Sequence, residues 1–398
     1  MKDHFPWEAA PHLPWSHFTS PLEQWQVLPS FVFGEYMYFA ATLAALVHAY
    51  RSGRGYLLVW LAALIAGTAN DLIFMALPLV DNFWQAQATV MLTPRLPLYI
   101  PCVYVCFLYY PTVAARRAGL GPWSTAALAG LIGCLYYAPY DIVGAKFLWW
   151  TWHDTDQPIA RRILGAPVSS SLWVLTFVSS FAWLVGRALG DAVDVSASTF
   201  AKGFALVAGL TTALMMVQIT IVQQLDGGAP GYIAFATTIA LYAAVVWRDR
   251  GALGSVARPR DGLAQAVVTA HFATFVLILA VFSPETHRST GVHQLPGECY
   301  VETTDLTGFT RHQHLCVTDF DEDYSFACAA PPGDGAEWYT VCGRPHSSFA
   351  AWMFGVVLLA AAGIAVFRTL FGDSLTWRAG GISIRSDDQN RSPSVHPV

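Results

Sequence analysis

Residues 348–371 read SFAAWMFGVVLLAAAGIAVFRTLF, and Arg368 is the one charged residue in this stretch. A hydrocarbon layer about 30 Å thick requires about 20 consecutive apolar residues in a helix that crosses it. Backbone N–H and C=O groups cannot remain unpaired in lipid, so a single crossing segment of this kind must be helical. The stretch therefore predicts a transmembrane helix.

Eight further stretches have the same length and character. The composition agrees, because 12% of the residues are charged, whereas a soluble domain carries about 25%. The mean hydropathy is +0.42. We predict an all-α integral membrane protein with about nine transmembrane helices, at residues 29–50, 56–79, 82–111, 123–142, 168–186, 203–223, 231–247, 263–284 and 348–371.

The basic residues indicate the orientation, because they fall almost entirely on alternate connections. By the positive-inside rule, the face that carries them is cytoplasmic. The N-terminus is then extracytoplasmic and the C-terminus cytoplasmic. No basic block suggests a nucleic-acid partner, and the expected partner is the lipid bilayer. The basic residues on this face are Arg51, Arg54, Arg116, Arg117, Arg187, Lys202, Arg248, Arg250, Arg258, Arg260, Arg368, Arg378, Arg385 and Arg391.

The same patterns divide the chain into five parts. We expect an extracytoplasmic N-terminal segment at 1–28, an eight-helix membrane core at 29–284 and a hydrophilic extracytoplasmic connection at 285–347. A ninth helix at 348–371 and a polar, disordered cytoplasmic tail at 372–398 follow.

Four cysteines fall in the long hydrophilic connection: Cys299, Cys316, Cys328 and Cys342. Disulfides persist outside the cytoplasm, and an even count in a small segment predicts two bridges with three possible pairings. The alternative is a zinc site, which the absence of a C-x-x-C pair disfavours. We therefore expect a small disulfide-bonded subdomain and no metal.

Ionisable residues inside the predicted helices are the best indication of function, because each costs roughly 2.5–3.5 kcal/mol to insert. Glu35, Asp71 and Asp141 all fall in the outer half of their helices. Such clustering predicts a cavity near the outer face.

The third predicted helix contains Trp84, Gln87 and Arg95, with Pro94, Pro97 and Pro101 close by. Proline removes an amide donor and disfavours helix in the preceding residue, so we expect this helix to be broken near the midplane. Arg95 then needs an anionic partner. The partner is Asp71 or Glu35, in a pair that only fixes helix packing, or it is the phosphate or carboxylate of a ligand.

A second strip, residues 141–156, joins Asp141 to Trp149, Trp150, His153 and Asp154. The tryptophans are typical of an aromatic belt at a membrane interface. The cluster His153, Asp154 and Asp156 has three interpretations. It holds a divalent cation, it forms a histidine acid/base supported by aspartate, or it is a solvated loop.

The region 136–173 carries a resemblance. An acidic residue and Gly, a Trp-rich stretch and the helix start Gly165-Ala166-Pro167-Val168-Ser169 leading to Trp173 are similar to membrane carotenoid-biosynthesis proteins of the hydratase and lycopene cyclase types. The resemblance implies chemistry on an isoprenoid. The chain departs from it at Ser170, where Asn is expected, and it lacks the acidic motifs of the cyclases.

Over its full length, the chain resembles an uncharacterised family of polytopic membrane proteins. The runs that carry this resemblance are Phe83–Gln87, Arg95–Tyr99, Trp338-Tyr339 and Cys342-Gly343. It implies a shared fold and no particular activity.

The first functional hypothesis is a membrane-embedded enzyme that acts on an isoprenoid or another lipid. Asp71 or Asp141 is the candidate proton donor, because a buried carboxylic acid that stays neutral can protonate a C=C bond. Aromatic faces would stabilise the carbocation. Candidate lining residues are Trp84, Trp149, Trp150 and Trp173.

In a lipid transferase or hydrolase, Arg95 would instead hold a phosphate, and His153 would be the base. The second hypothesis is a transporter or a binding protein without catalysis, because transporters also build sites at broken helices. A scaffold subunit is the third. The sequence identifies no cofactor and does not predict the oligomeric state.

Overall fold

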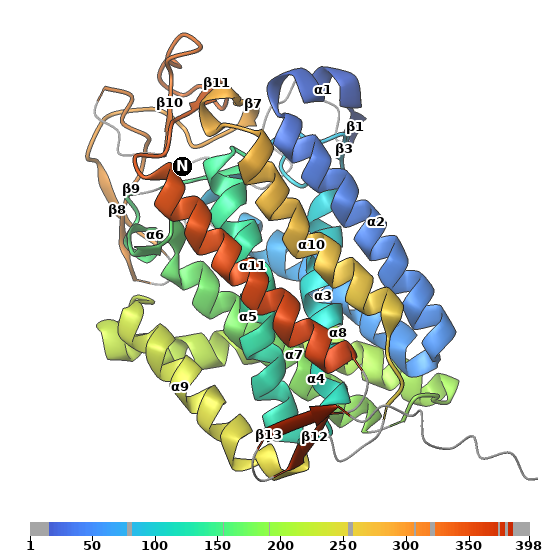
Figure 1. Ribbon diagram of the computed structural model, residues 1–398. Coiled ribbons are helices and arrows are strands. Elements are labelled where there is room, and N and C mark those ends of the chain that lie inside the picture. Colours follow the sequence, from blue (N-terminus) through green and yellow to red (C-terminus); the bar gives the residue numbers. More distant parts are fainter. Residues whose placement is uncertain are drawn as a thin grey trace, which may run out of the picture.

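The computed structural model describes residues 16–77, 82–153, 155–190, 192–253, 258–305, 308–318 and 323–372, together with the backbone of two strands in the tail. Figure 1 shows a bundle of long helices, with β12 and β13 at one end and most of the short strands gathered at the other. We call this end, which carries β7, β10, β11 and the start of α2, the disulfide end.

Seven helices are long and apolar enough to cross a membrane, as expected for an integral membrane protein. In several of them the start follows from local sequence. Pro29 and Pro122 occupy the first turn of their helices, where a missing N–H costs nothing. Ser196 and Asp261 cap two others by accepting backbone N–H groups. The seven are α2 (Pro29–Ser52), α3 (Arg54–Ala76), α5 (Pro122–Lys146), α7 (Val168–Leu189), α8 (Ala197–Val222), α10 (Gly262–Val281) and α11 (Phe349–Phe371).

The predicted count of nine spans is therefore not confirmed. Of the two other long helices in the described residues, α9 (Tyr232–Arg248) has 17 residues. α4 (Tyr99–Arg117) contains four tyrosines and two prolines, which lower its hydropathy. It packs against α2, α3, α5, α7 and α11 and is buried along nearly its whole length. A helix covered by protein on every side does not need a lipid-facing apolar surface.

The prediction that residues 82–111 form one membrane-spanning helix, broken near its prolines, is wrong for the first part of this range. Strands β2 (Phe83–Gln85) and β3 (Val90–Met91) occupy its first part, and the helix begins at Tyr99. Pro94 and Pro97 disfavour helix in this segment, and strand partners from elsewhere in the chain satisfy its backbone. β2 pairs with β4 (Trp150–Trp152), and β3 pairs with β1 (His17–Phe18).

Arg95 consequently lies in a non-helical segment before α4. Trp84, on the same segment, packs against Val292 and Trp338 from the loop between α10 and α11. The segment therefore belongs to the disulfide end.

The fold is mostly but not purely helical, because the loop between α10 and α11 forms two small sheets. β11 (Trp338–Gly343) lies between β7 (Arg288–Val292) and β10 (Tyr324–Ser325), and all pairs are antiparallel. β8 (Glu302–Thr304) and β9 (Thr310–His312) form a separate hairpin. The prediction of two disulfides is confirmed, with the pairing Cys299–Cys316 and Cys328–Cys342.

Short elements complete the connections. The helix α1 (Pro21–Val27) precedes α2, and α6 (Gln157–Ala160) follows β4. β5 (Arg162–Ile163) and β6 (Ala166–Pro167) pair just before α7, and the 3-10 turns are η1 (Gln223–Asp226), η2 (Arg250–Ala252) and η3 (Pro284–Thr286). In the tail, β12 (Leu375–Arg378) pairs with β13 (Gly381–Ile384). The tail predicted as disordered therefore contains a short hairpin, whose residues Thr376, Trp377, Ile382 and Ile384 have high β-propensity.

Candidate functional site

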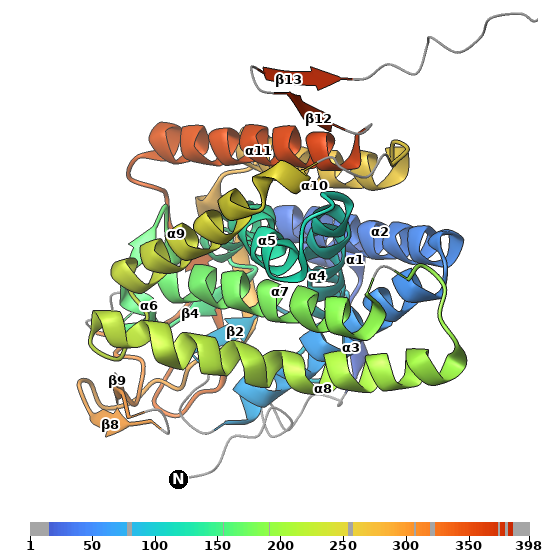
Figure 2. The same ribbon diagram turned by 90° about the horizontal axis from the view of Figure 1, so that it is seen from below.

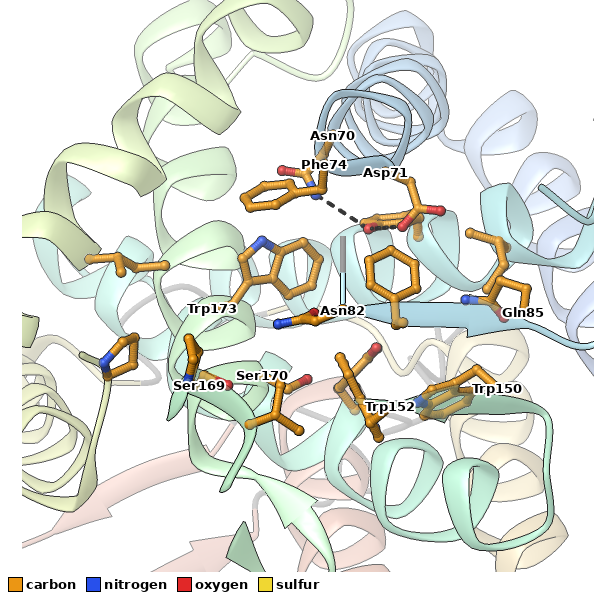
Figure 3. A pocket seen from close by; sticks show the side chains of 18 of the residues that line it. Asn70, Asp71, Phe74, Asn82, Gln85, Trp150, Trp152, Ser169, Ser170 and Trp173 are labelled. Atoms are coloured by element: carbon orange, nitrogen blue, oxygen red, sulfur yellow. Dashed lines mark hydrogen bonds between the residues drawn. The ribbon is translucent and has the colours of Figure 1, made fainter. Parts of the chain in front are cut away.

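A cavity of about 220 Å³ lies near the disulfide end, between α3, α4, α5, α7 and α8. Figure 3 shows Asn70, Asp71 and Phe74 of α3 on one side and Trp150, Trp152 and Ser170 on the other. Aromatic side chains are the largest group in the lining. The aromatic residues that line it are Phe74, Phe83, Tyr104, Phe107, Tyr137, Tyr140, Trp150, Trp152, Trp173 and Phe309.

Asp71 is fixed in the cavity wall by a chain of hydrogen bonds from neighbouring helices. The Tyr104 hydroxyl donates to Asp71 Oδ1 over 3.0 Å, and Asn70 Nδ2 donates to that hydroxyl over 3.3 Å. Thr212 of α8 donates in turn to Asn70 Oδ1 over 3.2 Å. Asp71 Oδ2 is buried and has no hydrogen-bond partner in the described part of the chain. A hydrogen bond thus fixes Asp71 Oδ1, whereas Oδ2 accepts none from the described residues.

The pairing of β2 with β4 explains which side chains of these strands reach the cavity. Gln85 pairs with Trp150 and Phe83 pairs with Trp152. Paired residues share a face of the ladder, and successive residues alternate between the faces. These four side chains accordingly line the cavity. Trp84 lies on the opposite face and does not line it.

Gln85 presents its amide nitrogen to the cavity (Figure 3). Its Oε1 accepts a hydrogen bond of 3.0 Å from Tyr99, whose hydroxyl also lies 3.4 Å from that of Tyr140. These contacts orient the amide, and Nε2 makes no hydrogen bond to any described residue. The Gln85 amide can therefore donate to a polar atom of a ligand.

Helix α7 contributes Ser169, Ser170 and Trp173 to the cavity. Trp173 stacks on Phe177 at a centroid distance of 5.0 Å, which fixes its ring. Asp141 of α5 is 1% exposed, does not line the cavity and has no hydrogen-bond partner for either carboxyl oxygen among the described residues. Ser170, which lines the cavity, is a side chain that interacts with the Asp141 carboxyl.

Three other candidates serve the packing of the disulfide end. Glu35 is fully buried and accepts hydrogen bonds from the Thr89 N–H (3.1 Å) and the Thr89 hydroxyl (2.6 Å). Gln87 Nε2 donates to the Pro94 carbonyl over 3.0 Å. Trp149 donates to the Ser30 hydroxyl over 3.1 Å. None of the three is among the cavity-lining residues.

Arg95 does not line the cavity, although it contacts the lining residue Phe83 and its charge acts on Asp71. It is 4% exposed, its Nη2 donates to the Phe83 carbonyl over 3.3 Å, and its guanidinium lies 5.9 Å from the centre of the Trp84 ring. A buried guanidinium with these contacts is not accessible to a lipid phosphate in this structure.

His153 belongs to a buried network beneath the hairpin β8–β9. Its Nε2 lies 3.3 Å from the His312 carbonyl and 3.6 Å from Asp156 Oδ1. Arg311, which lines the cavity, donates to Asp156 over 2.7 Å and to Asp305 over 2.5 Å. Asp154 lies outside the described residues. Among those that are described, no three His, Cys, Asp or Glu side chains come together to hold a metal.

The structure thus brings Asp71, Trp150 and Trp173 together and places the other candidates elsewhere. Sequence reasoning missed Tyr104, Gln85, Ser170 and Arg311. Neutral polar residues in a segment predicted to be an apolar helix give little indication of a site. Arg311 lies far in sequence from the other three residues. Of the four, Tyr104 is the one that the sequence could best have indicated, because a buried Tyr hydroxyl usually has a hydrogen-bond partner.

Comparison with known proteins adds a family but no activity. No curated protein and no solved structure matches the chain, so the resemblance to carotenoid-biosynthesis proteins is unsupported. Residues 15–371 match the family described as a domain of unknown function, DUF7802. Because this match covers nearly the whole sequence, the chain belongs to the DUF7802 family.

Proposed function

We propose that this protein binds a lipid-class molecule, such as an isoprenoid, in the aromatic cavity and modifies it with Asp71 as the acid or base. One observation carries the proposal. The Asp71 carboxyl lies in an aromatic cavity wall, and its Oδ2 has no hydrogen-bond partner in the described part of the chain. A cavity lined mainly by apolar and aromatic side chains, with a few oriented polar groups, is typical of sites for apolar ligands.

The chemistry that suits these residues is protonation of a polyene. The Asp71 carboxyl would transfer its proton to one carbon of a C=C bond, which forms a C–H bond and leaves a carbocation on the other carbon. Trp150, Trp173 and Tyr137 would stabilise this cation through their ring faces. Water addition or loss of a neighbouring proton then returns one proton to Asp71.

Polar groups opposite Asp71 would orient a ligand that carries a hydroxyl or carbonyl. Gln85 offers an amide donor, and Ser170 offers a hydroxyl that can donate or accept. Asp141 does not line the cavity but interacts with Ser170, and it is a second candidate acid that would act on the cavity through that hydroxyl.

One observation favours binding or transport without catalysis as the alternative. Among the described residues that line the cavity, Asp71 is the one acidic side chain. Acid/base catalysis by a pair of carboxyl groups would therefore need Asp141 to act through Ser170.

The cavity belongs to the outer leaflet if the predicted orientation holds. Arg51, Arg116, Arg187, Arg248 and Arg368 lie in the last turns of α2, α4, α7, α9 and α11. These helices all run from the disulfide end to the opposite end (Figure 1). We propose that the N-terminus is extracytoplasmic and the C-terminus cytoplasmic, with the disulfides outside.

The test uses the purified full-length protein in D₂O with a C20 polyene hydrocarbon. Mass spectrometry follows deuterium incorporation into the polyene and the amount of polyene bound. We expect Asp71→Asn to lower incorporation at least 100-fold while binding persists. The matched control is Glu35→Gln, an equally buried carboxyl that does not line the cavity. Equal incorporation by the two variants would contradict the role of Asp71, and binding without incorporation by the wild type would favour the alternative.

A further inference from the structure

A second cavity, of about 620 Å³, lies between α5, α7, α8 and α9, away from Asp71. Figures 1 and 2 show that α8 and α9 diverge from their short connection. Because α9 packs against α5 and α7, the divergence leaves a space beside α8. Apolar side chains, among them Ala126, Ala127, Leu214 and Val245, form much of the wall.

The polar groups inside this cavity already satisfy one another. The Ser179 and Tyr242 hydroxyls are 2.6 Å apart, and Tyr242 donates to Gln218 Oε1 over 2.6 Å. Gln218 Nε2 donates to the Ser180 hydroxyl over 2.6 Å. This series of hydrogen bonds joins α7, α8 and α9. Because these polar groups bond to one another, few hydrogen-bonding groups remain for water. Cavities without such groups favour apolar occupants.

The charged residues at one end of the cavity are Arg248 and Asp249, where α9 ends. Arg248 is exposed and makes no hydrogen bond or ion pair with any described residue. Asp249 Oδ2 accepts the Gly121 N–H over 3.0 Å, which leaves Oδ1 available. Trp123, 70% exposed, lines the same end and is the residue type enriched at membrane interfaces.

We propose that this cavity is a binding site for phosphatidylethanolamine. One acyl chain fills the apolar space as far as Tyr242, which lies six residues, or about 9 Å, before Arg248 along α9. The phosphate then meets Arg248 and the ammonium group meets Asp249. The two adjacent opposite charges match a zwitterionic headgroup that carries hydrogen-bond donors, and they disfavour a purely anionic one. This site is separate from the aromatic cavity and does not depend on its proposed chemistry.

Photocrosslinking in lipid nanodiscs tests the assignment. The full-length protein carries p-benzoylphenylalanine in place of Leu214 or Val245, which line the cavity, and is placed in equal parts phosphatidylethanolamine and phosphatidylglycerol. The control position is Leu210, one turn from Leu214 on α8 and 49% exposed. Leu210 does not line the cavity, so its adducts give the reference ratio for lipid outside it. Mass spectrometry of the adducts gives the ratio of the two lipids at each position.

We expect the ratio of phosphatidylethanolamine to phosphatidylglycerol at positions 214 and 245 to be at least fivefold that at 210. Arg248→Gln and Asp249→Asn should each bring it down to the value at 210. Asp249→Asn is a conservative test, because the amide oxygen still accepts the Gly121 N–H. Equal ratios at all three positions, or adducts at 210 alone, would overturn the proposal. Asp71→Asn should leave the ratios unchanged, so the two proposals fail separately.

Discussion

The Tyr104 hydroxyl donates a hydrogen bond to Asp71 Oδ1 across 3.0 Å, so α4 fixes the carboxyl that α3 presents to the cavity. Both residues are nearly inaccessible, at 6% exposed. This hydrogen bond therefore links the packing of α4 to the candidate site.

Tyr104→Phe should destabilise the protein and disturb the site. The change leaves both Asp71 oxygens without a donor, and an unsatisfied buried polar group costs about 1–3 kcal/mol. We expect a lower midpoint of thermal unfolding in detergent and weaker polyene binding. The control is Tyr137→Phe, because Tyr137 lines the same cavity and its hydroxyl makes no hydrogen bond to a described residue. Equal effects of the two variants would contradict the importance of the contact.

Gly67→Ala should also separate α3 from α4. A Cβ at Gly67 would lie 2.2 Å from Tyr104 Cβ, which cannot move without shifting the helix. Overpacking of this kind costs about 1–3 kcal/mol. Gly209→Ala on α8 is the matched control, because nothing lies within 4 Å of its added Cβ. Thermal unfolding should show a clear loss for the first variant and little change for the second.

Much of the helical fold could be predicted from the sequence, because long apolar stretches in a bilayer leave the backbone few alternatives. The error at residues 82–98 arose from a non-local contact. The prolines indicated a broken helix, but β2 is a strand because β4, about 65 residues later, pairs with it. The low hydropathy of α4 reflects its position inside the bundle, which the sequence did not reveal.

The candidate site was predictable only in part. Asp71 was found because a carboxyl in an apolar helix is costly. Trp150 was found because it belongs to a Trp-rich strip, and Trp173 because it belongs to the helix start that follows this strip. The same cost argument also selected Glu35, whose partner is Thr89. A buried charge indicates that a partner exists, but whether this partner is the protein or a ligand depends on contacts between distant segments.

Removal of either disulfide should loosen the disulfide end without unfolding the helices. The bridges close loops of 17 and 14 residues, and a 15-residue loop is worth about 3 kcal/mol by chain entropy. Cys299→Ser with Cys316→Ser should release the hairpin β8–β9, which carries Phe309 and Arg311 into the cavity wall. Hydrogen exchange of Thr310–His312 should then rise.

Cys328→Ser with Cys342→Ser provides the comparison, because this bridge joins β11 to the segment after β10. It should raise exchange in β10 and β11 and leave Thr310–His312 protected. Unchanged exchange in both double variants would show that the bridges are not needed for the packing of this end.

The stability of the disulfide end should fall as the pH is lowered from about 6.5 to 4, because two buried histidines there must remain neutral. His287 lies after α10, where its Nδ1 donates to the Ser283 carbonyl over 3.0 Å and its Nε2 accepts the Ser30 N–H over 3.4 Å. These contacts require the neutral ring. Burial lowers the pKa of His287 from 6.5 to about 4, and burial likewise lowers that of His293 to about 4.

Between pH 4 and 6.5 the unfolded state therefore binds more protons than the folded state, so stability rises with pH in this window. The stabilisation is complete above about pH 6.5 and is lost as the pH falls towards 4, at roughly 3 kcal/mol for each histidine. The measurement is hydrogen exchange of β7 and β11 as a function of pH, corrected for the intrinsic rate. His293→Gln should remove about half of the pH dependence, because the amide does not titrate. An unchanged pH profile in this variant would show that His293 is not the group that titrates.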